Sequence, residues 1–218
     1  MPRATLATPP FRVDPHRRYS IAEWQTIEEI TGERYEYHEG KLVSVRAMAG
    51  GTGPHALISG NVQFALGQLA RARDATTPAD NDHGQGVACG VYSSDLRLMI
   101  ESDDRYVYPD AAVVCGRPVY DTKVSTAVRN PLLVVEVVSP SSESYDAGDK
   151  FDYYATLASL RDYVLVAQDR PRVEVRSRVQ PGADWTIRVA EGLDAEAHLS
   201  GLEAGMPLRE VYRLVEFA

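Results

Sequence analysis

The spacing of apolar residues changes along the chain, and each spacing predicts a different element. Residues 20–31 repeat apolar side chains at helical intervals, beginning with Ser20-Ile-Ala-Glu23, which fits a capping box. Residues 34–45 alternate around Glu39-Gly40, which predicts a hairpin of two strands. From Pro54 to about Arg73, apolar residues recur every three or four positions, which predicts a longer helix.

The second half of the chain is dominated by short strand-like runs. Strands are predicted at residues 87–92, 95–100, 106–115, 163–167, 172–178 and 185–190. Residues 132–138 form the most apolar run, which suits a central strand covered on both faces. A helix is predicted from about Asp146 to Leu157. This order predicts an α/β (α+β) fold with a mixed β-sheet flanked by helices.

Composition is that of one globular domain. The 218 residues are 44% hydrophobic and 25% charged, and they contain no apolar run of about 18 residues that could span a membrane. We expect a single domain over residues 19–218 after a flexible basic arm over residues 1–18. The arm lacks the apolar stretch of a secretory signal, so a cytoplasmic location is expected.

The cysteines Cys89 and Cys115 give no sign of a metal site. They are too far apart in sequence for a typical zinc motif, and the expected cytoplasmic setting argues against a disulfide. We therefore predict two buried free thiols.

The formal net charge of −8 bears on the choice of partner. Broad, non-specific binding to a nucleic-acid backbone normally needs a basic surface. An acidic nuclease is compatible with this rule when its carboxylates gather at a metal site and its basic groups line a local groove.

Two carboxylates interrupt apolar strands. Glu136 is the one charged residue of the 132–138 run, and a buried charge is unfavourable unless it is paired or binds a metal. Asp110 follows Pro109, where a strand starts or bulges and can aim a side chain into a cleft. Each has an ordinary alternative, since Glu136 could be bridged to an arginine and Asp110 could be a turn residue.

Taken together, the two carboxylates favour a site for a hard cation. Mg²⁺, with Mn²⁺ as a substitute, needs only one or two protein carboxylates, and the backbone carbonyl of Val137 could add a third oxygen. Lys150 shares a helical face with Tyr154 and could orient a metal-bound water. The alternative for Lys150 is a surface lysine that balances neighbouring aspartates.

These motifs resemble the Uma-type restriction endonuclease family of the PD-(D/E)XK nuclease superfamily. Tyr108-Pro109-Asp110, the run 133–142, and Lys150 with Tyr154 carry the resemblance. It covers about residues 19–178 and includes Arg34-Tyr35-Glu36-Tyr37, His55, Asp95-Leu96-Arg97 and residues 162–166. The resemblance implies a restriction-endonuclease-like core, metal ligands at Asp110, Glu136 and Val137, and Asp110, Glu136 and Lys150 as catalytic residues.

One position departs from the superfamily pattern. The lysine expected two residues after Glu136 is Val138, and the resemblance implies that Lys150 takes its role from the following helix. The resemblance also suggests four secondary site residues, for each of which a structural role is equally open: Glu36, His55, Asp95 and Tyr154.

The resulting expectation is a Mg²⁺-dependent endonuclease that hydrolyses phosphodiester bonds of DNA. By analogy with nucleases that cut two strands, a homodimer is expected, with no membrane association. Two alternatives stay open: a catalytically inactive module of the same fold that binds nucleic acid or protein, and an enzyme that acts on another phosphate ester or nucleotide.

Overall fold

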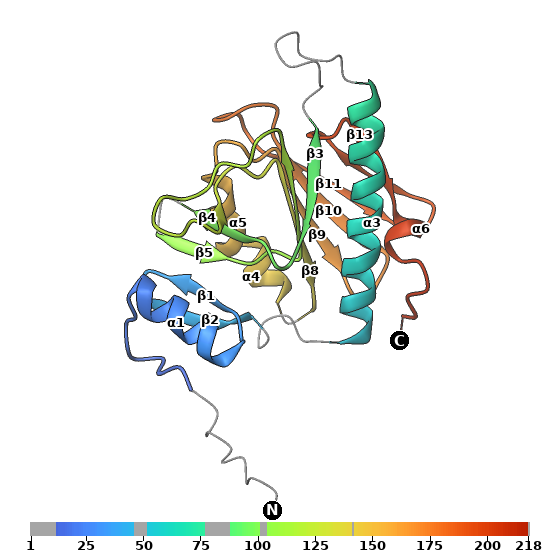
Figure 1. Ribbon diagram of the computed structural model, residues 1–218. Helices are drawn as coiled ribbons and strands as arrows, with labels where there is room; N and C mark the ends of the chain where they lie inside the picture. The colour runs from blue at the N-terminus through green and yellow to red at the C-terminus, as the bar shows by residue number, and fades with distance from the viewer. Residues whose placement is uncertain (1–11, 46–51, 77–87, 101–103, 141, 218) are drawn as a thin grey trace, which may run out of the picture.

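The structure is a computed structural model that describes residues 12–45, 52–76, 88–100, 104–140 and 142–217. Two main β-sheets pack against each other, and a long helix, α3, lies along the larger one (Figure 1). Mixed sheets flanked by helices confirm the predicted α/β (α+β) class. The prediction of one sheet was incomplete, because the strands divide between two main sheets and a two-stranded pair.

The smaller sheet has the strand order β2-β1-β5-β4-β7 and carries the N-terminal helix. Helix α1 (Ile21–Thr31) begins after Ser20, where the predicted capping box with Glu23 is present. Trp24 of this helix is fully buried against Tyr37, which fixes the helix to the sheet. The strands are β1 (Tyr35–His38), β2 (Lys41–Ser44), β4 (Arg97–Ile100), β5 (Arg105–Val107) and β7 (Ala127–Val128).

The larger sheet has the strand order β11-β10-β9-β8-β6-β3, in which only the β8–β9 pair is parallel. Strand β8 is buried at every position, which confirms the central, doubly covered strand expected from its apolar run. The six strands are β3 (Cys89–Ser93), β6 (Ala111–Cys115), β8 (Leu133–Val138), β9 (Asp162–Ala167), β10 (Arg172–Ser177) and β11 (Thr186–Glu191).

Helices cover both faces of the larger sheet. On one face, α3 (Gly53–Thr76) packs Ile58, Val62 and Leu66 into the core. The same core includes side chains from β12 (Glu196–Leu199), β13 (Ala204–Pro207) and α6 (Leu208–Val211). On the other face, Tyr154 packs between the two sheets, and the helices there are α4 (Glu143–Ala147) and α5 (Asp149–Ala155). Among the described residues, no helix is both long and apolar enough to cross a membrane.

Three parts of the predicted secondary structure were wrong or incomplete. The strand predicted over 106–115 is divided at Pro109, which cannot donate to a ladder; β5 joins the smaller sheet and β6 the larger one. The helix predicted over 146–157 is two short helices that meet at Gly148. The elements β12, β13 and α6, beyond residue 190, were not predicted at all, because each spans only four residues.

The predicted N-terminal arm is described only in part. Residues 1–11 lie outside the described residues. Nearer the domain, Arg17 pairs with Glu23, and Arg18 donates to the backbone carbonyl of Glu39. The last residues of the arm therefore contact helix α1 and the hairpin, while the flexibility of the rest stays a prediction.

The prediction of two free thiols was wrong, because Cys89 and Cys115 form a disulfide. The two residues are 26 positions apart in sequence but are directly opposed in the antiparallel β3–β6 ladder. Sequence separation therefore misled the prediction, since strand register decides which side chains meet. Disulfides persist mainly in oxidising compartments, so the pair gives no support to the cytoplasmic expectation, which stays a prediction.

Candidate functional site

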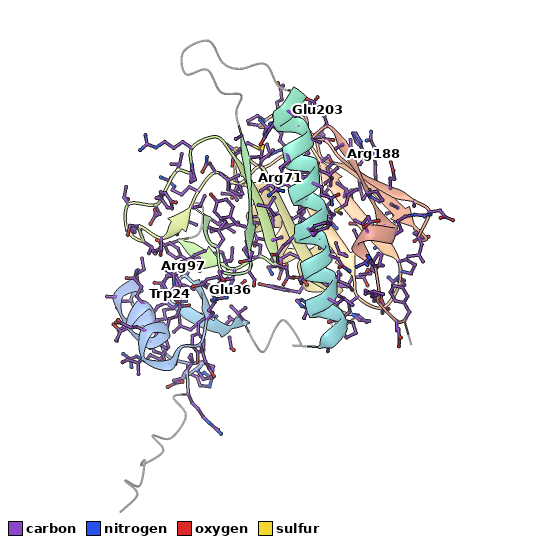
Figure 2. The ribbon with its side chains drawn as sticks, turned by 45° about the vertical axis from the view of Figure 1, so that its right-hand side comes forward. Trp24, Glu36, Arg71, Arg97, Arg188 and Glu203 are labelled. Carbon is purple, nitrogen blue, oxygen red and sulfur yellow. A yellow bond between two sulfur atoms is a disulfide. The ribbon has the colours of Figure 1, made fainter. Side chains whose placement is uncertain are left out.

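A cavity of about 690 Å³ lies where the smaller sheet, the larger sheet and the N-terminal half of α3 come together. Figure 2 labels Glu36 on the side of the N-terminal hairpin that faces the rest of the molecule. Residues from β1, α3, β8, α4, α5 and the 108–110 segment line the cavity. Its charged side chains are Arg34, Glu36, Asp110, Glu136, Asp146 and Lys150, with His55 beside them.

Asp110 enters the cavity at the point where the chain crosses from β5 to β6 and so from one sheet to the other. Its Oδ2 accepts a hydrogen bond of 2.7 Å from the backbone N–H of Val137, which joins it to the neighbouring strand β8. The same oxygen lies 3.4 Å from Nε2 of His55. The hydrogen bond with Asp110 raises the pKa of His55, although partial burial opposes the shift.

The segment before Asp110 is held by an arginine inside an aromatic cluster. The Arg97 guanidinium lies 4.6 Å from the ring centre of Trp24, and its Nε donates to the hydroxyl of Tyr108 at 2.8 Å. Figure 2 shows Arg97 and Trp24 next to each other beside the smaller sheet. Because the backbone of Pro109 has little conformational freedom, fixing Tyr108 also fixes the direction in which the chain continues to Asp110.

Glu136 is 4% exposed, and both of its oxygens are engaged. Oε1 accepts from the Tyr154 hydroxyl at 3.0 Å, and Oε2 lies 2.9 Å from Nζ of Lys150. Burial raises the pKa of Glu136 to about 8; Asp110 adds to the shift and Lys150 opposes it. The surroundings therefore disfavour the ionised form of Glu136, and a positive charge beside the carboxylate stabilises that form.

Lys150 projects from α5 into a ring of carboxylates. Besides Glu136, its Nζ lies 3.4 Å from Asp146 Oδ1 and 3.9 Å from Glu36 Oε1. Burial alone would lower the pKa of Lys150, but Glu136 and Glu36 raise it well above its ordinary value. The side chain is therefore a buried ammonium group. Val138, the position at which the superfamily pattern has its lysine, is packed in the core.

Glu36 is fully buried and closes the cavity from the side of β1. Burial favours its neutral form, but Lys150 and His38 outweigh this and hold the pKa of Glu36 below its usual range. Its Oε1 also accepts from the backbone N–H of Tyr108 at 3.4 Å. Glu36 is therefore an ionised group that links the hairpin to Lys150 and to the segment carrying Asp110.

The donor set fits a divalent cation. Within the described residues, no three acidic, imidazole or thiol groups converge into a ready-made metal centre. The cavity nevertheless brings together Asp110, Glu136 and the Val137 backbone, an all-oxygen set of the kind Mg²⁺ uses alongside water and substrate. Its four carboxylates outnumber the two cations Arg34 and Lys150, so a bound cation would relieve the excess of negative charge.

The structure brings almost all predicted site residues together. One cavity is lined by Asp110, Glu136, Val137, Lys150, Glu36 and His55. Tyr154 donates a hydrogen bond to Glu136. Asp95 is the exception, because it is not among the residues that line the cavity. It lies in the turn between β3 and β4, where its side chain is 72% exposed and paired with Arg34. A turn aspartate at a sheet edge is solvated and has no reason to enter a cavity.

Sequence reasoning missed one carboxylate beside Lys150 and one residue that contacts Glu36. The carboxylate is Asp146, whose spacing of four from Lys150 on one helical face could have identified it as a partner. His38 gave no usable signal, because its role depends on the pairing of β1 with β5.

Comparisons with known proteins bear on the family and the fold of this chain. The family model Uma2, described as "Putative restriction endonuclease", matches residues 21–209. "Uncharacterized protein slr1290" of Synechocystis sp. (strain ATCC 27184 / PCC 6803 / Kazusa) is 30% identical over 203 residues, 93% of this chain and 96% of that protein. "Uncharacterized protein sll1609" of the same organism is 29% identical over 181 residues, 83% of this chain and 92% of that protein.

A solved structure shows the same fold. It is described as "a putative nuclease belonging to DUF820" from Anabaena variabilis ATCC 29413, and it superposes with a TM-score of 0.61 at 14% identity. The match covers 85% of this chain and 93% of that chain. The likeness confirms the predicted restriction-endonuclease-like core.

Proposed function

Because the chain belongs to the Uma2 family, described as "Putative restriction endonuclease", we propose that it is a Mg²⁺-dependent nuclease that hydrolyses phosphodiester bonds of DNA. One observation supports this proposal above the others. Asp110 and Glu136, from neighbouring strands, face one cavity with the Lys150 ammonium 2.9 Å from Glu136. Two carboxylates that can hold a cation, with a lysine beside them, are groups that can carry out metal-assisted phosphodiester hydrolysis.

In this proposal Asp110, Glu136 and the Val137 carbonyl hold the cation. When bound, the cation polarises the phosphate and lowers the pKa of a coordinated water. Tyr154 keeps Glu136 oriented by donating to Oε1, and the Val137 N–H keeps Asp110 oriented by donating to Oδ2. Lys150 keeps a positive charge beside Glu136, where it orients the attacking water and stabilises charge that develops on the phosphate.

DNA is proposed as the substrate because the family description names a restriction endonuclease. We further propose a homodimer, by analogy with nucleases that cut two strands as symmetric dimers. A dimer would also compensate for the acidic net charge of −8 if the arms with Arg12, Arg17 and Arg18 lay along the DNA.

The proposal is tested by cleavage assays with Asp110→Asn and Glu136→Gln. Each variant keeps its size and loses the charge that holds the cation, so we expect Mg²⁺-dependent cleavage of plasmid DNA to fall on the order of 10³-fold. Glu174→Gln is the matched control, because Glu174 is a strand glutamate on β10 that pairs with arginines outside the cavity. It should keep wild-type activity.

The substrate and the metal need separate measurements. Plasmid, single-stranded DNA, RNA and a small phosphodiester are incubated with the wild-type chain and Mg²⁺ or Mn²⁺, and calorimetric titration measures binding of each metal to the wild type and to Glu136→Gln. Cleavage of DNA that depends on metal and on Glu136 supports the proposal. Failure to bind either metal tightly, together with no cleavage of any substrate, would favour the inactive binding module, and cleavage of the small ester alone would favour the phosphate-ester hydrolase.

A further inference from the structure

His38 lies behind the cavity, one hydrogen bond away from its lining. The residue ends strand β1, and its side chain is 10% exposed. Nε2 lies 2.9 Å from Oε2 of Glu36, and Nδ1 lies 2.7 Å from Nη1 of Arg105 on the neighbouring strand β5. Both ring nitrogens therefore have a specific partner, and one of these partners belongs to the cavity.

The chemistry of the two partners fixes the proton on the ring. An arginine guanidinium can only donate hydrogen bonds, so Nδ1 of His38 accepts and carries no proton. The Glu36 carboxylate can only accept, so Nε2 carries the proton and donates it. The two hydrogen bonds thus hold the His38 ring with Nε2–H directed at Glu36.

Arg105 is itself fixed to the helix that carries the lysine. Its guanidinium lies 3.7 Å from the ring centre of Tyr153, three residues after Lys150 on α5. The His38 ring also meets Tyr153 edge-on, with ring centres 6.4 Å apart. A continuous chain of contacts therefore joins two residues of α5. It runs from Tyr153 to Arg105, His38 and Glu36, and ends at Lys150.

Glu36 passes this constraint to the ammonium group. Its Oε2 takes the His38 proton, while Oε1 faces Nζ of Lys150 at 3.9 Å and accepts from the Tyr108 N–H at 3.4 Å. A freely rotating Glu36 would release one of the three carboxylates around Lys150. The Lys150 ammonium group would then be held by Asp146 and Glu136 alone and could move between these two carboxylates.

We propose that His38 is a positioning residue of the active site, which orients Glu36 through its Nε2–H and, through Glu36, holds Lys150 beside Glu136. The effect on catalysis rests on the proposed nuclease function. The ring tautomer and the immobilisation of Lys150 do not, and they can be measured on the metal-free protein. His38 does not line the cavity, and it reaches the site through Glu36.

The test compares two replacements. His38→Gln can still donate an amide N–H to Glu36, whereas His38→Phe keeps a ring of similar shape and makes neither hydrogen bond. His16→Phe is the control, because His16 is an exposed histidine near the N-terminus. Melting temperatures are measured for all three, so that the comparison uses folded protein.

Nuclear magnetic resonance gives the readout that is independent of activity. In the wild type, ¹H–¹⁵N correlation of the imidazole rings should show His38 as the neutral Nε2–H tautomer. The chain has only three lysines, Lys41, Lys123 and Lys150, so the ammonium signal of Lys150 can be assigned with a Lys150→Met variant. We expect this signal to be sharp in the wild type and in His38→Gln, and lost to exchange in His38→Phe.

Kinetics on DNA with Mg²⁺ give the second readout. His38→Phe should lower kcat by about 10- to 100-fold with little change in KM, and His38→Gln should restore most of the loss. A His38 ring protonated at Nδ1 or at both nitrogens would overturn the proposal, as would a Lys150 signal unchanged in His38→Phe. Should the wild-type chain cleave nothing, the nuclease function fails, and the two resonance measurements alone decide whether His38 positions Lys150.

Discussion

Two buried carboxylates on neighbouring parallel strands have opposite surroundings. Glu136 on β8 faces a cavity and is met by an ammonium group, a phenol and further carboxylates. Asp162 opens β9 and is fully buried among neutral donors, with Ser177 Oγ at 2.6 Å, the Gly201 N–H at 2.6 Å and the Ser200 N–H at 3.1 Å. Burial raises the pKa of both side chains.

The contrast shows that burial and a raised pKa do not identify an active site. Asp162 has fixed neutral donors for both oxygens, so it ties the start of β9 to β10 and to the residues between β12 and β13. Glu136 instead belongs to a set of charged groups that do not balance and that open onto a cavity. We infer that the contacts of Asp162 serve stability, whereas the surroundings of Glu136 suit the chemistry proposed for it.

The largest effect that tests this comparison is the loss of stability expected for Asp162→Ala. The substitution leaves two backbone N–H groups and a serine hydroxyl without an acceptor, so the free energy of unfolding should fall by about 3 kcal/mol. Denaturant titration measures the change. Folded Asp162→Ala should keep its Mg²⁺-dependent cleavage, and a selective loss of kcat at full stability would instead place Asp162 in the site.

The sequence alone predicted most of the features that are formed by residues close together in the chain. The capping box at Ser20, the hairpin at Glu39-Gly40 and the buried strand with Glu136 follow from local pattern, and the structure contains all three. Glu136 could be singled out because a charge within an apolar strand conflicts with its surroundings. Lys150 depended on resemblance, since nothing local connects it with a strand twelve residues earlier.

Features that depend on pairing between distant strands could not be predicted. The Cys89–Cys115 disulfide follows from the β3–β6 register, and the contact between His38 and Arg105 follows from the β1–β5 register. Asp162 was likewise noted only within a motif, because its donors Ser200 and Gly201 come from a C-terminal segment whose elements are too short to show a period.

A smaller effect tests how tightly Asp162 is enclosed. A Cβ at position 201 would lie 2.9 Å from Asp162 Oδ2 and 3.1 Å from Leu132 Cγ, so Gly201→Ala should lower the free energy of unfolding by about 2 kcal/mol. Gly67→Ala is the matched control on α3, where a Cβ meets nothing within 4 Å and should stabilise the helix by about 1 kcal/mol. Equal effects from the two substitutions would contradict the tight enclosure of Asp162.

The effect that is smallest over a single pH unit concerns how stability changes with pH near Glu136. Its folded pKa of about 8 lies above its ordinary value of 4.5, so the folded state holds the extra proton between these values and stability falls as pH rises through that window. The slope is at most about 1.4 kcal/mol per pH unit, the value for one proton. Above pH 8 both states are ionised and this contribution is constant.

Glu136→Gln removes the titrating group while keeping a side chain that can accept from Tyr154. Its free energy of unfolding, measured without metal from pH 5 to about pH 8, should therefore decline less steeply than that of the wild type. The variant should also be at least as stable as the wild type near pH 8, because it no longer buries an ionised carboxylate beside Asp110. A parallel decline in the two proteins would mean that Glu136 is already ionised and balanced by Lys150. The site would then be as neutral as the surroundings of Asp162, and the distinction between the two carboxylates would rest on the cavity alone.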